Sequence, residues 1–206
     1  MRQLIDHTRT FRSRYHGAGR NLQDFAGGQR PSAMFITCSD SRVVPTLLTG
    51  SGPGELFELR TAGNIVPAYD PDAATSEMAT IEYAVCVLEV SDIILCGHSH
   101  CGAVGALARG EDLATMPAVR GWLDRSTPAG GGFRSPEGIE EPDDFGPDVA
   151  RPVQRHVVAQ LEKLRAYPCV SQAAGEGRLG LHAWYYEVHT GAVQSHRVST
   201  GTFSSL

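Results

Sequence analysis

The chain has 206 residues and a formal net charge of -5, and this length suffices for one domain with a real core. Hydrophobic residues make up 41% and charged residues 20%, so a globally disordered chain is excluded. No apolar run approaches the ~20 residues of a membrane span. The sequence pI of about 5.9 argues against a general nucleic-acid binder. We therefore expect neither nucleic acid nor a membrane among the partners.

The lysine and cysteine content narrows the chemistry further. Lys163 is the single lysine, so no P-loop lysine follows a glycine loop and only one side chain could form a Schiff base. Five cysteines follow an N-terminus that is too polar for a secretory leader. We interpret them as thiols or metal ligands of a cytoplasmic protein rather than as a disulfide framework.

The predicted elements alternate between strands and helices along the chain. In chain order they are a helical N-terminal arm over 1–30, strands at 33–37 and 55–60, a helix within 73–90, a strand at 92–96, a helix over 101–109, a helix around 153–164, and a hairpin of 179–188 with 192–198. This order predicts an α/β fold: a central parallel β-sheet with flanking helices and a C-terminal antiparallel strand or hairpin. We expect a single domain over 1–206, with 126–148 as an acidic surface loop rich in glycine and proline.

Two motifs follow predicted strands directly. The first is Cys38-Ser39-Asp40-Ser41-Arg42, and the second runs from Gly97 through His98 and Cys101 to Gly102. Because ligands collect beyond the carboxyl ends of parallel strands, the two motifs can converge. Their thiols and imidazole suit Zn²⁺, which takes sulfur and nitrogen in tetrahedral geometry. The alternative is a buried thiol cluster with a satisfied histidine.

The fourth metal position depends on Asp40. Cys38, His98 and Cys101 leave one tetrahedral corner open, as in catalytic sites, whereas Asp40 as a further ligand would close it. Arg42 stands two residues later and can grip that carboxylate in a bidentate pair. Asp40 would then be an acceptor beside a metal-bound water whose pKa zinc lowers toward ~7.

At this point the sequence resembles the β-class carbonic anhydrases. The motifs that carry the resemblance span residues 38–43, 60–67 and 97–104, with 76–83 similar to the helix between them. The resemblance implies one zinc ion per chain on Cys38, His98 and Cys101, and a catalytic dyad of Asp40 with Arg42. It also implies CO2 and bicarbonate as substrates, and a homodimer or higher oligomer in which the leading helix embraces the partner.

The resemblance further implies a substrate site. Gln29 stands where the family has a substrate-side glutamine, and Phe57 and Tyr83 stand where a plant-like branch has aromatic residues lining the CO2 pocket. Ala62 and Gly102 complete the predicted set. Phe35 occupies the position at which members with a regulatory bicarbonate site carry tryptophan, so that site is not implied.

Two other functions compete with CO2 hydration. The same metal centre could hydrolyse a related heterocumulene, CS2 or COS, because one sequence does not show pocket access. A non-catalytic zinc protein would instead close the site with Asp40, although such a site has no need of Arg42. Of the other cysteines, we expect Cys86 and Cys96 to be inert core thiols, whereas Cys169 lies near a loop.

Overall fold

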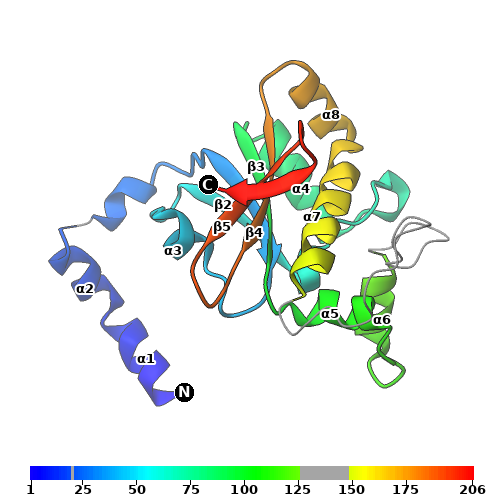
Figure 1. Cartoon of the computed structure of the whole chain (residues 1–206). Coiled ribbons are helices and arrows are strands. Elements are labelled where there is room, and N and C mark those ends of the chain that lie inside the picture. Colours follow the sequence, from blue (N-terminus) through cyan, green and yellow to red (C-terminus); the bar gives the residue numbers. More distant parts are fainter. Residues whose placement is uncertain (20, 126–148) are drawn as a thin grey trace. The chain divides into compact units, whose positions relative to one another are not determined.

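The computed structural model describes residues 1–19, 21–125 and 149–206 (Figure 1). The described chain falls into two compact units, residues 1–30 and residues 31–206, and each is described by itself. The predicted acidic loop over 126–148 lies outside the described residues.

The first unit consists of short helices. They are α1 (Arg2–Arg9), α2 (Phe11–Gly17) and the 3-10 helix η1 (Leu22–Phe25). None of these helices contains a buried residue. Tyr15 makes ring contacts with Phe11 and Phe25 at centroid distances of 5.5 and 6.5 Å. Helices this short are marginal in water, so their stability requires packing against other surfaces.

The second unit is built on one six-stranded sheet with the order β2-β1-β3-β4-β5-β6. The first four strands in that order run parallel, and β5 and β6 are antiparallel to their neighbours. The predicted fold class, with its parallel core and C-terminal hairpin, is confirmed, and β6 is a strand that the sequence patterns missed. The strands are β1 (Ala33–Cys38), β2 (Leu56–Thr61), β3 (Asp92–His98), β4 (Gly180–Tyr186), β5 (Val193–Arg197) and β6 (Thr202–Ser205).

The two faces of the sheet carry unequal cores. The larger core joins one face, with Met34, Ile36 and Leu95, to α4, α7 and α8. The smaller core on the other face contains Phe35 and Cys96, with Leu48 of α3 packed against it. Every residue of β1 is buried, which explains why it is a continuous apolar run and does not alternate.

The predicted helices of this unit occur in the predicted order, and the structure contains further short helices that were not predicted. Three short α-helices escaped prediction, α3, α6 and α8, because each has fewer than nine residues, too few for a helical pattern to repeat clearly in the sequence. Each begins with proline at its first turn, which was the available signal. No helix in the described parts of the chain is long and apolar enough to cross a membrane. The helices are α3 (Pro45–Thr49), η2 (Ala62–Asn64), η3 (Pro71–Ala73), α4 (Ser76–Cys86), α5 (Gly102–Arg109), α6 (Pro117–Asp124), α7 (Ala150–Arg165) and α8 (Pro168–Gly175).

Candidate metal centre

The two predicted motifs meet at the carboxyl edge of the sheet. β1 and β3 are parallel neighbours with Thr37 opposite Cys96, so the chain leaves both strands at the same edge. Cys38 ends β1, His98 ends β3, and Cys101 precedes the first residue of α5. The ligand atoms of Cys38, His98 and Cys101 all lie within 4.8 Å of one another, and all three residues are buried.

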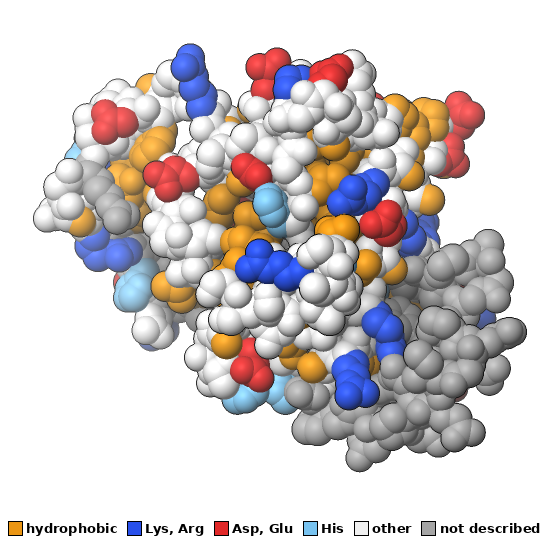
Figure 2. All heavy atoms as spheres, turned by 45° about the horizontal axis from the view of Figure 1, so that its top comes forward, with side chains coloured by type: hydrophobic (Ala, Val, Ile, Leu, Met, Phe, Trp, Pro, Cys, Tyr) orange, Lys and Arg blue, Asp and Glu red, His pale blue; other side chains and the backbone are white. Residues whose placement is uncertain are grey.

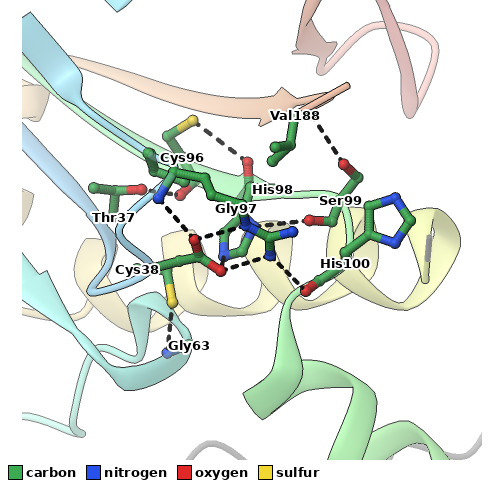
Figure 3. A network of polar contacts seen from close by, with 12 residues as sticks. Thr37, Cys38, Gly63, Cys96, Gly97, His98, Ser99, His100 and Val188 are labelled. Atoms are coloured by element: carbon green, nitrogen blue, oxygen red, sulfur yellow. Dashed lines mark hydrogen bonds and ion pairs between the residues drawn. The ribbon is translucent and has the colours of Figure 1, made fainter. Parts of the chain in front are cut away.

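His98 presents one ring nitrogen to this cluster. Its Nδ1 lies 2.8 Å from the Ser99 carbonyl oxygen, which can only accept, so Nδ1 carries the hydrogen and Nε2 keeps its lone pair (Figure 3). Nε2 is buried and has no hydrogen-bond partner in the described structure. A buried nitrogen lone pair without a donor is costly in a metal-free protein. The alternative of a satisfied histidine therefore does not match the geometry, whereas a metal ligand does.

The two thiols form an unequal pair. A hydrogen bond from the Cys101 thiol lowers the pKa of Cys38, and the backbone N–H of Gly63 approaches the Cys38 sulfur at 3.4 Å. The same bond with Cys38, together with burial, raises the pKa of Cys101. These directions favour Cys38 as the thiolate of the pair, the form that binds metals.

Asp40 is held away from the cluster by Arg42. The guanidinium donates from Nε to Oδ1 at 2.9 Å and from Nη2 to Oδ2 at 2.7 Å, and the Arg42 backbone N–H donates to Oδ1 at 2.9 Å. The hydrogen bonds from this arginine hold the pKa of Asp40 well below its usual range, against an opposing contribution from burial. Asp40 Oδ2 stays 4.0 Å from His98 Nε2. This is the open arrangement, in which the carboxylate is a neighbour of the metal position and not a ligand.

Arg60 organises the loop after β1 and was missed as a site residue. Its guanidinium donates to the carbonyl oxygens of Cys38, Asp40 and Val43, with distances of 2.8 to 3.2 Å. Its place at the start of the 60–67 motif was a signal, but nothing indicated its target.

The segment after β2, residues 62–67, is anchored by side chains from distant helices. His156 of α7 lies with Nε2 2.8 Å from the Gly63 carbonyl oxygen, and Gly63 in turn donates to Cys38. Gly63 has a φ of 73°, and a Cβ there would lie 3.0 Å from the Ala103 Cβ, which accounts for glycine at this position. The remaining anchors are Trp122 to Ala62, Gln160 to Val66 and Tyr167 to Pro67.

The predicted substrate residues are only partly placed. Phe57 of β2 and Tyr83 of α4 lie with ring centroids 6.0 Å apart in a tilted arrangement, and Tyr83 is 45% exposed. Gly102 begins α5 directly after Cys101, and Ala62 begins η2 directly after β2. Gln29 is exposed in the first unit.

The prediction for the remaining cysteines was wrong in one case. Cys96 is fully buried, as predicted, but Cys86 is exposed. The buried face of α4 contains Met78, Ile81 and Val85, and one further residue along a helix rotates the side chain by about 100° out of that face.

Comparisons with known proteins agree with this geometry. A protein-family description of carbonic anhydrase matches residues 33–193. A carbonic anhydrase of Pseudomonas aeruginosa is 44% identical over 207 residues, covering 100% of this chain and 92% of the relative. One from Synechococcus elongatus is 41% identical, covering 94% of this chain and 70% of the relative.

Solved structures show the same similarity. The β-carbonic anhydrase CcaA superposes with a TM-score of 0.85 at 34% identity, covering 100% of this chain and 92% of that chain. A tetrameric β-carbonic anhydrase from Sordaria macrospora has a TM-score of 0.73 at 26% identity, covering 98% of this chain and 96% of that chain.

Proposed function

Since the chain belongs to the β-class carbonic anhydrases, we propose that it hydrates CO2 reversibly to bicarbonate and a proton at a zinc ion held by Cys38, His98 and Cys101. The observation that carries this proposal is the buried His98 Nε2, which has no hydrogen-bond partner and lies within 4.8 Å of both sulfurs. A nitrogen and two sulfurs form the donor set of a catalytic zinc site with three protein ligands. Each chain offers one such set in its described part.

When bound, zinc would supply Lewis acidity that lowers the pKa of a coordinated water toward ~7. The protein supplies orientation. Asp40 is ionised at neutral pH, and the hydrogen bonds from Arg42, which lower its pKa, keep it ionised in acid as well. Its carboxylate can therefore accept a hydrogen bond from the attacking oxygen and direct that oxygen's lone pair toward the carbon of CO2.

The substrate pocket is proposed to use the neighbouring rings of Phe57 and Tyr83. CO2 is uncharged and accepts hydrogen bonds weakly, so an apolar wall suits it better than a polar one. Ala62 and Gly102 flank Gly63 and Cys101 in the sequence, which favours a place beside the reacting atoms. Gln29 is proposed as a polar substrate contact from the first unit.

We further propose a homodimer or a higher oligomer. The helices α1 and α2 bury no residue of their own, and apolar side chains stay exposed in the second unit, Leu47 at 81% and Val87 at 60%. Hydrophobic side chains are also visible among charged ones on the face shown in Figure 2. Side chains exposed in this way are available for contact with a partner. The relative from Sordaria macrospora is tetrameric, which supports the same assembly principle. A cytoplasmic location stays a prediction from the cysteine content.

Stopped-flow CO2 hydration by the zinc-loaded protein, followed across pH with parallel metal analysis, tests the proposal. We expect about one zinc per chain and turnover that rises with pH as the nucleophile forms. Hydrolysis of COS or CS2 without CO2 turnover would show that the substrate of this site is one of those heterocumulenes and not CO2. Full zinc occupancy with Asp40 ligated at every pH and no turnover would show a closed, non-catalytic site.

A further inference from the structure

A second pair of thiols lies on helices away from the metal centre. Cys86 is the last residue of α4, and Cys169 is the second residue of α8. These two helices pack against each other. Both cysteines line the same pocket of about 490 Å³, together with Glu89, Gln172 and Arg178. We call Cys86 and Cys169 the helix-end thiol pair.

The two sulfurs are close enough to interact. The Cys86 side chain contributes to the raised pKa of the Cys169 thiol, which indicates that the two groups interact, although both cysteines are free in this structure. Cys86 is exposed and Cys169 is half-buried, so the pair combines a thiol that reagents can reach with one sheltered behind it. Each stands at a helix end, where the backbone moves more easily than in the middle of a helix.

A metal ion does not fit this pair as well as a disulfide does. Zinc sites use three or four protein ligands. Among the described residues, the only group of three or more metal-ligating side chains is the one at Cys38, His98 and Cys101. The helix-end thiol pair therefore offers two sulfurs and no third ligand.

We propose that Cys86 and Cys169 form a reversible intrachain disulfide that fastens α4 to α8 under oxidising conditions. With hydrogen peroxide as the oxidant, the Cys86 thiolate attacks one peroxide oxygen, the O–O bond breaks, and a sulfenic acid and water result. The Cys169 sulfur then attacks the sulfenic sulfur, the S–S bond forms, and a second water leaves. Two thiols and one peroxide thus become one disulfide and two waters, and a dithiol reductant reverses the bridge by exchange.

The bridge would form without disturbing the metal ligands. Ser91, which lines the pocket, directly precedes β3, whereas His98 ends that strand at the opposite edge of the sheet. Six strand steps separate Asp92 from His98, which corresponds to roughly 20 Å. The bridge also closes a chain loop of roughly 80 residues, which restricts the unfolded chain and stabilises the folded one. We expect the melting temperature to rise by roughly 5 °C on oxidation.

The test oxidises the zinc-loaded protein with a small excess of hydrogen peroxide, because bound zinc protects Cys38 and Cys101. After blocking of free thiols, digestion with trypsin and a protease that cleaves before aspartate separates the cysteines. Cys169 then lies alone in 166–178 and Cys86 alone in 72–91, apart from Cys96 and Cys101. We expect mass spectrometry to find these two peptides linked, and a dithiol to separate them.

Cys86→Ser and Cys169→Ser are matched controls for each other. Each removes one sulfur from the same pocket, and neither residue belongs to the metal centre. We expect both variants to keep their zinc content and CO2 turnover, and to lose the oxidation-dependent rise in melting temperature. Oxidation of Cys86 to a sulfinic acid without linkage, or a linkage between two chains on a non-reducing gel, would overturn the proposal. Neither result bears on zinc binding or CO2 hydration, so the two proposals fail separately.

Discussion

The chain contains two thiol pairs whose surroundings give them different chemistry. Cys38 and Cys101 share their space with the His98 ring nitrogen, and the Gly63 N–H approaches the Cys38 sulfur. The pocket around Cys86 and Cys169 offers Glu89, Gln172 and Arg178 and no imidazole. The first pair is buried, whereas Cys86 of the second is exposed. A pair of sulfurs thus becomes a metal site only where a third ligand is aimed at it and backbone donors stabilise the thiolate.

The pKa directions express the same difference. Cys38 has its pKa lowered by the Cys101 thiol, with further help from His98 and the Gly63 N–H. Burial raises the pKa of Cys169 to about 11, and Cys86 and Glu82 add to that rise. At neutral pH one pair is prepared as a ligand, while the sheltered sulfur of the other stays protonated until an oxidised partner reacts with it.

The largest expected effect comes from matched substitutions in the two pairs. Cys38→Ser should lower zinc affinity by more than ~100-fold and abolish CO2 hydration, since losses outside the ligand shell already cost up to that factor. Cys86→Ser makes the same chemical change in the other pair and should leave both properties unchanged. Metal analysis and stopped-flow kinetics of the two variants decide the matter. Normal zinc content in Cys38→Ser, or loss of zinc from Cys86→Ser, would show that the two thiol pairs do not differ in metal binding as proposed.

The next largest effect concerns Asp40 and Arg42, which lie beside the pair of Cys38 and Cys101. Arg42→Ala removes both guanidinium hydrogen bonds to Asp40 and should reduce CO2 turnover by about 100-fold or more, while zinc stays bound. The freed carboxylate is 4.0 Å from His98 Nε2 and can reach the metal position. Because Asp40 would then take the place of water in the fourth position, X-ray absorption at the zinc edge should show scattering from a carboxylate carbon behind the oxygen ligand. Arg42→Lys keeps the charge without the bidentate geometry, so its CO2 turnover should lie between that of the wild type and that of Arg42→Ala. Wild-type turnover in Arg42→Ala would remove the dyad from the mechanism.

A pH effect tests how the first pair is supported. Burial lowers the pKa of His156 to about 4, so the folded protein resists protonation that the unfolded chain accepts near the ordinary histidine pKa of 6.5. Stability is therefore full above pH 6.5 and is lost as the pH falls toward 4, by about 2 kcal/mol between pH 7 and pH 5. His156→Gln keeps a donor for the Gly63 carbonyl and should lose this dependence. Urea unfolding of the zinc-loaded wild type and His156→Gln at pH 7 and pH 5 measures how the free energy of unfolding of each depends on pH. Titrations at the metal site are common to both proteins and cancel when the two are compared. Equal slopes would show that His156 does not titrate in this range.

The sequence patterns predicted that the two strand ends lie close together, but they did not predict which residues support them. Cys38 and His98 each end a buried apolar run, and the parallel arrangement brings such ends to one edge, so their proximity could be predicted. The contact of His156 with Gly63 joins residues far apart in the chain. Nothing in the sequence distinguishes His156 from the other seven histidines as the one that makes this contact. Cys86 was misplaced because an apolar segment does not define which residue of the last helical turn faces the core. The roles of Asp40, Arg42 and the substrate residues stay predictions.

The smallest expected effect concerns the second pair. Burial is the main cause of the raised pKa of Cys169, and the carboxylate of Glu82 contributes a smaller part. Glu82→Gln removes that negative charge, so the thiolate fraction of Cys169 should rise and alkylation by iodoacetamide at fixed pH should accelerate by about two-fold at low salt. Glu77→Gln, on the same helix but absent from the groups that shift Cys169, is the matched control and should leave the rate unchanged. Counting labelled 166–178 peptide over time in the zinc-loaded protein gives both rates. If added salt left the two-fold difference unchanged, its cause would be repacking around the thiol rather than charge.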